Sequence, residues 1–472
     1  MIEKLTKPIR SLLPRARQIS SVARLKPFET ATPEGRSKER YRRIVLTTIS
    51  TLLTRGVGML ASLATVALAL AYLGKEQYGL YATITSLLAW IVVFNFGIVN
   101  GLVNAVSQAH GKNDDQAAGS YVSVAFFMLV IIAALLGAVF VLIAPFIPWS
   151  ELLAVRGVVD DRVVAWSVGA AVIAVLVGMP LSIIPQVYAG YQKIYVANFF
   201  LLAGYLLTLL GVYAAVHLNA SLPVLVLIFG GAMPIATLFN LIYISKFEMP
   251  WLRPRLSRFS LKAVKRLTDT SLPLFLFQVG ALMVNQTTLV ILAHRTDLKV
   301  VADYSIIWRL YMLLIGVIVL STSSFIPSFR ESYERGDHNW MRSSFKKLLY
   351  LRMLLAASSG LLVVFAGNWL LRIWLRQEAM SFGIEVWLAL AVLLLSATWV
   401  TAFSDFLIIM DKIWGQVAFV SANGIITVLL TFWLSPSLGV LGVIVSVGFL
   451  TTVVWTWLLP LMARSTLGSE RP

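Results

Sequence analysis

The feature of this sequence that most constrains its fold is the recurrence of long apolar runs along almost the whole chain. A helix needs about 20 predominantly apolar residues to cross the hydrocarbon core of a bilayer. Hydrophobic residues make up 58% of the 472 residues, charged residues only 13%, and the mean hydropathy is +0.83. An ordinary soluble domain carries about 25% charged residues. The sequence therefore predicts an all-α integral membrane protein.

Twelve transmembrane helices can be placed on these runs, and a polar linker divides them into two sets of six. The first six-helix bundle is expected over 44–245, the linker over 246–270 and the second six-helix bundle over 271–462. The expected helices are 44–73, 78–107, 120–147, 163–188, 194–217, 221–245, 271–293, 301–328, 345–367, 382–410, 413–434 and 437–462. We expect residues 1–43 to form a disordered basic tail and residues 463–472 a short cytoplasmic end.

The distribution of basic residues predicts the orientation. With the N-terminus inside, thirty of the 39 Lys and Arg residues lie in the tail, the inner loops and the C-terminal end, and only seven lie in outer loops. Loops rich in Lys and Arg stay in the cytoplasm, so both termini are expected there, in a multi-pass protein of the inner (plasma) membrane. In the linker, Leu256, Phe259 and Val264 alternate with basic positions, which is typical of an interfacial amphipathic segment in contact with membrane lipids.

Other function classes find little support. The net charge of +17 does not form a compact basic face with interleaved aromatic residues, so we expect no nucleic-acid partner. The chain has no cysteine, its four histidines show no metal-ligand spacing, and it has no GxxxxGK[ST] loop. We therefore expect no metal, no cofactor, no ATP-driven engine and no enzyme activity.

The two halves share a faint internal repeat. The segment LAYLGKEQYGLYATI at 70–84 aligns with LAHRTDLKVVADYSII at 292–307, and GYQKIYVANFFLLAGYLLTLL at 190–210 aligns with MDKIWGQVAFVSANGIITVLL at 410–430. Six helices separate the members of each pair, so the two copies have the same orientation in the membrane. A parallel duplication is typical of transporters whose halves rock about a central cavity.

Two segments resemble the oligosaccharide flippases of the MOP superfamily, the Wzx-type exporters of O-antigen and exopolysaccharide. They are YLGKEQYGLYATITSLLAWIVVFNFGIVNGLVNAVSQAHG at 72–111 and SFRESYERGDHNWMRSSFKK at 328–347. The family has an Asp-Phe-Gly-like element where this chain has Asn95-Phe96-Gly97, so no acidic role carries over to that position. The basic tail is also longer than is usual in the family.

The resemblance implies a V-shaped pair of bundles that moves an undecaprenyl-diphosphate-linked oligosaccharide from the cytoplasmic to the periplasmic leaflet. It also implies a lipid-linked glycan as substrate and the polysaccharide polymerase or export machinery as partner.

Two arginines fall inside predicted spans, where charges are rare and usually face a cavity. Arg55 lies about 16 Å along the first helix, and Arg309 lies about 12 Å from the outer end of the eighth. Guanidinium groups give the forked donors that a diphosphate requires. Alternatively, Arg55 pairs with an acid on another helix or extends to the interface, and Arg309 extends to the interface or pairs with Asp303 or Asp297.

Amide side chains are the other candidates for lining a glycan path. Asn100, Asn104 and Gln108 share one face of the second helix, and Gln278 and Asn285 share a face of the seventh. Amides at this spacing also form hydrogen bonds between membrane helices, at about 0.6 kcal/mol each, and that interpretation stays open. Asp405, near the cytoplasmic end of the tenth helix, is interpreted as an interfacial or capping carboxylate.

Two other functions compete with a flippase. A cation-coupled multidrug exporter of the MATE type would favour acids in the membrane core, and the first and seventh predicted helices contain none. A membrane glycan polymerase or ligase would carry a large periplasmic loop, whereas the longest predicted outer loops run only over 148–162 and 368–381.

Overall fold

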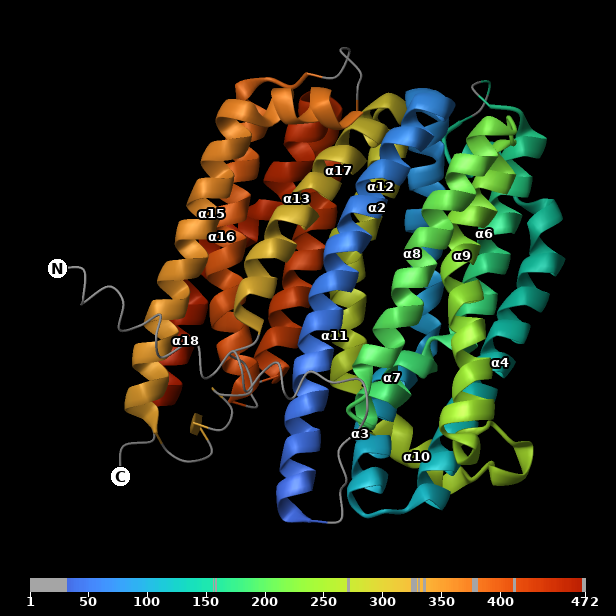
Figure 1. Cartoon of the computed structure of the whole chain (residues 1–472). Helices are drawn as coiled ribbons and strands as arrows, with labels where there is room; N and C mark the ends of the chain where they lie inside the picture. Colours follow the sequence, from blue (N-terminus) through green and yellow to red (C-terminus); the bar gives the residue numbers. More distant parts are fainter. Residues whose placement is uncertain are drawn as a thin grey trace.

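The computed structural model consists of two helical bundles standing side by side, with the first half of the chain on the right and the second on the left of Figure 1. It describes residues 32–155, 157, 159–269, 272–323, 329, 332–333, 337–375, 381–410 and 413–468. Residues 1–31 of the predicted tail lie outside this range. Across the described part of the chain the regular structure is helical, as predicted, and no strand occurs.

The first bundle is built from α2 (Pro33–Ala89), η1 (Trp90–Asn95), α3 (Ile98–Gly111), α4 (Asp115–Ile143), α6 (Asp161–Leu181), α7 (Ile183–Gly190), α8 (Ile194–His217) and α9 (Leu222–Tyr243). The second is built from α11 (Leu272–Leu282), η6 (Met283–Thr287), α12 (Thr288–Arg295), α13 (Leu298–Ser323), α15 (His338–Leu375), α16 (Ile384–Ile409), α17 (Ile413–Leu450), η7 (Thr451–Trp455) and α18 (Thr456–Gly468).

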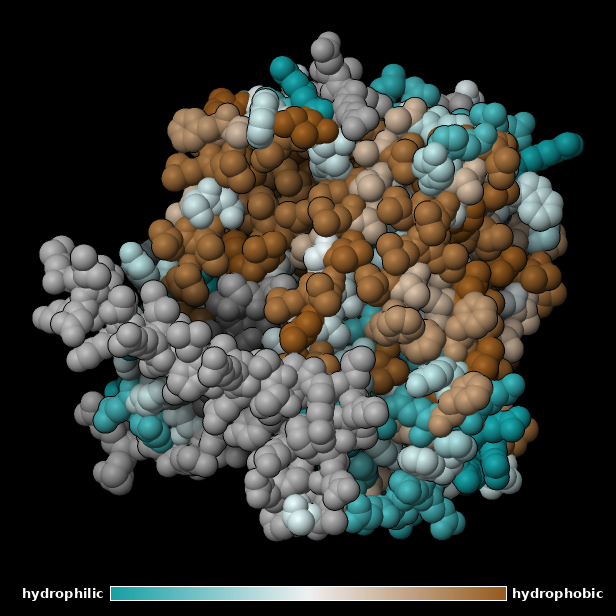
Figure 2. Space-filling model, in the orientation of Figure 1, coloured by the Kyte–Doolittle hydropathy of each residue, from teal (hydrophilic) through white to brown (hydrophobic). Residues whose placement is uncertain are grey.

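Ten of the described helical stretches are long and apolar enough to cross a membrane. Two of them, Val45–Asn95 and Trp414–Ala463, contain 51 and 50 residues, and each contains a glycine with non-helical dihedral angles, Gly74 and Gly439. A single crossing needs about 20 residues, so each long stretch can supply two crossings. The ten stretches are therefore consistent with the twelve predicted spans. Figure 2 shows the matching brown apolar band between more hydrophilic ends.

Several predicted helix boundaries and interiors differ from the structure. Helix α2 begins at Pro33, so residues 33–43 of the predicted tail are helical. The expected helix 78–107 is broken at Phe96 and Gly97, which both have positive φ. The expected helix 271–293 contains the π-helical turn Met283–Thr287, which includes the predicted site residue Asn285. Apolar periodicity does not specify such local breaks.

The predicted linker is irregular and packs on the first bundle. It contains the π-helical turn Ile244–Glu248, two short 3₁₀ turns and α10 (Leu261–Asp269). The backbone N–H of Arg255 donates to Ser123 Oγ at 3.1 Å, and Ser120 Oγ donates to the carbonyl of Arg258 at 2.9 Å. Leu256 is largely exposed and Phe259 partly so. The segment between the bundles is thus attached to α4.

Among the described residues, the large buried cluster that combines the two bundles lies at one end. Around Gly74, one buried cluster combines α2 residues such as Leu70 and Tyr78 with Leu292 and Tyr304 of the second bundle. At the end that carries the linker, one cluster draws only on residues between 98 and 267, and another only on residues between 329 and 463. We call the end around Gly74 the closed end, because hydrophobic packing joins the two bundles there.

Candidate functional site

A polar cavity of about 570 Å³ lies between the bundles, next to the closed end. We call it the arginine cavity. From α2 its lining includes Ser62, Tyr78, Tyr81 and Thr85, and from the second bundle it includes Asn285, Gln286, Ser305, Trp308 and Arg309. Ligand sites typically enclose about 300–1,000 Å³, so this cavity is large enough for a small organic group. Two of the predicted site residues, Arg309 and Asn285, meet here.

Arg309 projects into this cavity and binds the opposite bundle. Its Nη1 donates to Ser62 Oγ at 3.0 Å, across the boundary between α13 and α2. The two acids considered as its partners are engaged elsewhere: Asp303 pairs with Lys75 at 2.9 Å, and Asp297 Oδ1 accepts from the backbone of Lys299 at 2.7 Å. Within the described part of the chain Arg309 has no carboxylate partner. Its remaining N–H donors can therefore bind an anion.

Aromatic rings give the same cavity a second chemical character. Trp308 stacks on Tyr311, with ring centroids 4.7 Å apart, and lies 5.8 Å from the ring of Tyr304. Tyr304 and Tyr311 are buried, whereas Trp308 is partly exposed and lines the cavity. Packing from both sides fixes the orientation of the indole. The cavity therefore combines a rigid apolar surface with amide, hydroxyl and guanidinium donors.

A second cavity between the bundles, of about 930 Å³, carries amides from both of them. We call it the amide cavity. Its polar lining consists of Asn95, Asn104, Ser182, Gln186 and Gln278. Two predicted site residues, Asn104 of the first bundle and Gln278 of the second, thus share this cavity. Gln278 and Asn285, placed on one helix face from the sequence, line different cavities, because the π-helical turn Met283–Thr287, which contains Asn285, follows Gln278 and changes the helical register.

The break in the second predicted span borders the amide cavity. Asn95 is buried, and its Oδ1 accepts a hydrogen bond from the backbone N–H of Gly97 at 2.8 Å. A carboxylate would accept the same bond, so an amide here keeps the local turn while removing the negative charge. At this position the chain therefore lines the cavity with a neutral side chain.

The remaining predicted residues lie outside the two linings. Arg55 is exposed, and its side chain has no hydrogen bond or ion pair with any described residue. It lies seven residues before Ser62 on the same face of α2, about 10 Å along the axis from the Arg309 contact. Gln108 is exposed and lines neither cavity. The side chain of Asn100 lies outside the described residues.

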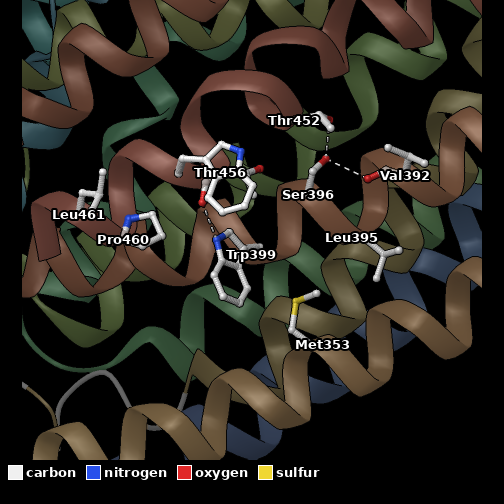
Figure 3. Close-up of a pocket in the computed structure, with 10 residues that line it drawn as sticks. Met353, Val392, Leu395, Ser396, Trp399, Thr452, Thr456, Pro460 and Leu461 are labelled. Carbon is white, nitrogen blue, oxygen red and sulfur yellow. Dashed lines mark hydrogen bonds between the residues drawn. The ribbon is translucent and has the colours of Figure 1, made fainter. Parts of the chain in front are cut away.

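An apolar pocket of about 610 Å³ lies within the second bundle, between α15, α16 and α18 (Figure 3). Its few polar groups bond to one another: Trp399 Nε1 donates to the carbonyl of Thr456 at 3.0 Å, and Thr452 Oγ1 donates to Ser396 Oγ at 3.0 Å. Val392 and Trp457 on its rim are exposed. With its polar groups satisfied, the pocket offers nothing to orient a polar ligand, so we do not consider it part of the site.

Asp405 forms an ion pair that the sequence did not reveal. Its Oδ2 accepts from Nη2 of Arg352 at 2.9 Å, which joins α16 to α15 within the second bundle. The sequence alone favours an interfacial or capping role for Asp405 and does not indicate its partner. The pair lies inside one bundle, so we assign it to the stability of that bundle rather than to the cavities.

With this geometry established, a comparison with known families identifies the chain. The model of the family described as "Polysaccharide biosynthesis protein" matches residues 44–332. The chain belongs to this family. The match covers the first bundle, the linker and the start of the second bundle, and it confirms the resemblance to the Wzx-type flippases. No curated protein matches the chain at a significant level.

Solved structures with the same fold are multidrug and related transporters of the MOP superfamily. An inward-facing multidrug resistance MATE transporter is 13% identical and has a TM-score of 0.73 over 88% of this chain and 98% of its own. An outward-facing MATE transporter is also 13% identical, with a TM-score of 0.64 over 91% and 97%. Family and fold together indicate a multi-pass membrane flippase or transporter rather than an enzyme.

A further structural relative comes from Pyrococcus furiosus. This MOP superfamily transporter, described as having a binding pocket of reverse polarity, is 13% identical to the chain. It has a TM-score of 0.66 over 91% of this chain and 96% of its own. At this level of identity the likeness concerns the fold.

The aromatic and hydroxyl side chains that line the arginine cavity were not predicted from the sequence. Tyr78, Tyr81 and Trp308 lie in apolar runs, where aromatic residues are most often core or interface residues. Ser62 is a small residue of the kind common in membrane helices. One available signal was that Tyr78 and Tyr81 fall within the repeated segment 70–84.

Proposed function

We propose that this protein is a flippase that moves an undecaprenyl-diphosphate-linked oligosaccharide from the cytoplasmic to the periplasmic leaflet during O-antigen or exopolysaccharide synthesis. The observation that carries the proposal is Arg309, a half-buried guanidinium between the bundles whose only side-chain hydrogen-bond partner among the described residues is the neutral Ser62. A cation without a carboxylate partner, in a site shielded from water, attracts an anionic cargo more strongly than it would in bulk water.

The proposed orientation places both termini in the cytoplasm of a cell with an inner membrane. The excess of Lys and Arg on the side of the tail and linker supports it. In this orientation the closed end is periplasmic, and the bundles separate toward the cytoplasm. The higher TM-score with the inward-facing transporter than with the outward-facing one, 0.73 against 0.64, agrees with this arrangement.

In the proposed cycle, the lipid diphosphate binds the cationic path formed by Arg55 and Arg309 while the polyprenyl tail stays in the bilayer. The amides of Asn104, Gln278 and Asn285, together with Trp308, contact the sugars, whose rings carry both hydroxyl groups and apolar C–H faces. Asn100 and Gln108, placed four residues before and after Asn104 on the same helix, are proposed to extend this amide lining in the two directions along the helix. Rocking of the two bundles then exposes the glycan to the periplasm, where polysaccharide polymerase or export machinery receives it.

A MATE-type drug exporter is the second candidate, favoured by the fold relatives. Export of cationic compounds would be helped by carboxylates in the transport path. Neither the arginine cavity nor the amide cavity has an Asp or Glu in its described lining. The polarity of the site therefore supports the flippase over the exporter.

The test is complementation of a strain that lacks its polysaccharide flippase, with quantification of the surface glycan. Wild type should restore the glycan, and Arg309→Ala should reduce the rate of restoration by about 10- to 150-fold, since a hydrogen bond to a charged group contributes about 1.5–3 kcal/mol. Arg309→Lys should be intermediate and Arg55→Ala impaired. Arg372→Ala is the matched control, because that arginine is exposed and lies outside both cavities. Full restoration by Arg309→Ala would remove the site from the proposal.

A further inference from the structure

Two oppositely oriented ion pairs join the bundles at the closed end. Lys75 Nζ of α2 lies 2.9 Å from Asp303 Oδ1 of α13, and Lys299 Nζ of α13 lies 3.3 Å from Glu76 Oε1 of α2. Each bundle thus contributes one cation and one anion. Each pair connects helices that rocking of the bundles would move apart, so neither pair can persist when this end opens.

The backbone holds these four side chains at the tips of helices. Gly74, with φ 70° and ψ 173°, separates the two helices of α2, and Lys75 and Glu76 follow it directly. On the other side, Asp297 Oδ1 accepts from the backbone N–H groups of Lys299 and Val300, at 2.7 and 3.0 Å, and so caps the start of α13. Lys299 and Asp303 are four residues apart and therefore share one face of that helix.

Close packing around the pairs completes the closure. A Cβ built on Gly79 would lie 2.1 Å from the carbonyl oxygen of Leu298, so the backbones of α2 and α13 touch there. Trp374 Nε1 of α15 donates to the carbonyl of Leu63 at 2.8 Å, a further contact between the bundles. Lys75 and Asp303 belong to the segments 70–84 and 292–307 that repeat in the sequence, so the duplication itself supplies both sides of the closure.

We propose that Lys75–Asp303, assisted by Glu76–Lys299, forms an outer gate that must break before the cavity can open to the periplasm. The proposal rests on the proposed orientation and transport cycle. Lys75–Asp303 is the stronger pair, because its side chains are 25% and 21% exposed, against 59% and 49% for Lys299 and Glu76. Removing one partner of an exposed pair costs little, whereas removing one partner of a more buried pair costs more because it leaves an uncompensated charge.

The gate lies next to the arginine cavity. Tyr78 and Tyr81 follow Lys75 by three and six residues on α2, and Arg309 follows Asp303 by six residues on α13. A cargo that binds Arg309 and the tyrosines therefore contacts the same two helix segments that the gate joins. This position allows an occupied cavity to influence the gate directly through α2 and α13.

The absence of cysteine from the natural sequence permits a direct test. Thr85→Cys places a single thiol in the lining of the arginine cavity, and a membrane-impermeant maleimide added outside spheroplasts reports access from the periplasm. With the gate intact, labelling should be slow. Lys75→Asp should speed it about 5- to 30-fold, the change expected from one or two kcal/mol, and the exchanged pair Lys75→Asp with Asp303→Lys should restore slow labelling. Glu76→Lys should have a smaller effect.

A matched control exists within the first bundle. Lys193 and Glu248 form a pair of the same 2.9 Å length with side chains 25% and 13% exposed, but both belong to one side of the cavity. Lys193→Asp should leave labelling of Cys at position 85 unchanged. The gate proposal would be overturned if Thr85→Cys alone and Thr85→Cys with Lys75→Asp were labelled at the same rate. It would also be overturned if the exchanged pair failed to restore slow labelling.

The readout is independent of cargo. If the protein fails to restore surface glycan but the variants show the predicted differences in labelling rate, the gate is supported and the glycan is rejected as the cargo. If the protein restores surface glycan but all variants label at the same rate, the glycan is supported as the cargo and the gate is rejected. Monodisperse elution of each variant establishes that it is folded, and recovery by the exchanged pair excludes misfolding as the cause of faster labelling.

Discussion

The Arg352–Asp405 pair provides a quantitative prediction, because its two members differ in burial. The side chain of Arg352 is 2% exposed, whereas that of Asp405 is 34% exposed. Asp405→Asn leaves a buried guanidinium without its carboxylate partner. Arg352→Met leaves a carboxylate that water can reach and that can also take up a proton. Removing the less buried residue should therefore cost more stability than removing the more buried one.

The expected loss of stability lies between the values for a fully buried and a fully exposed ion pair. Breaking a fully buried pair costs about 3–5 kcal/mol, and an exposed pair contributes less than about 1 kcal/mol. With Asp405 one-third exposed, we expect about 2 kcal/mol for Asp405→Asn and about 1 kcal/mol for Arg352→Met. For a unit the size of the second bundle, this corresponds to decreases in Tm of about 4–8 °C and 2–4 °C.

The assay is thermal unfolding of the purified protein in detergent, followed by the loss of monodisperse protein. The double variant Arg352→Met with Asp405→Asn should be more stable than Asp405→Asn alone, because no buried charge remains. Arg372→Met, at an exposed position of the same helix, should leave the Tm within about 1 °C of wild type. If Arg352→Met lowered the Tm more than Asp405→Asn, the burial of the unpaired charge would not determine the loss of stability.

Two further predictions concern the backbone and pH. Gly74→Ala should lower stability by about 1–3 kcal/mol, because its dihedral angles fall in a region that is essentially restricted to glycine; a Tm equal to that of wild type would contradict this. His110 has a lowered pKa, chiefly through burial and then through the charges of Arg43 and Lys193, against which Asp115 acts. A depressed histidine pKa means that the unfolded chain takes up a proton first, so stability is complete above about pH 6.5 and decreases as the pH falls below it. His110→Gln should flatten the dependence of Tm on pH between about 5 and 6.5, and an unchanged slope would rule out this residue as its source.

Much of the fold was predictable because hydrocarbon thickness dictates the length of a span. The long apolar runs indicated the membrane helices, and the break at Gly74 falls between the first two predicted spans, whereas the break at Gly439 lies just inside the predicted span 437–462. The left-handed turn at Phe96 and Gly97 and the π-helical turn at 283–287 were not predicted. They interrupt apolar stretches without changing hydropathy, so tertiary packing rather than local pattern selects them.

The site was predictable to a smaller extent. The rarity of a charge within a span indicated Arg309, and the spacing of the amides indicated Asn104, Gln278 and Asn285, all four of which line cavities. The partner of Asp303 could not be predicted, because Lys75 lies more than 200 residues away and only the arrangement of the bundles brings them together. The same applies to Tyr78 and Trp308, whose place in a cavity depends on which helix faces are left uncovered.

We propose that the chain carries an anionic lipid-linked glycan across a bilayer. The most direct test is reconstitution of the purified protein into liposomes with a short oligosaccharide on undecaprenyl diphosphate, followed by the appearance of the glycan on the opposite leaflet. We expect wild type to translocate the glycan, Arg309→Ala to translocate it much more slowly, and little translocation by wild type of the same glycan on an uncharged polyprenol. Equal translocation of the charged and uncharged lipids, or transport of cationic drugs without any movement of the glycan lipid, would contradict it.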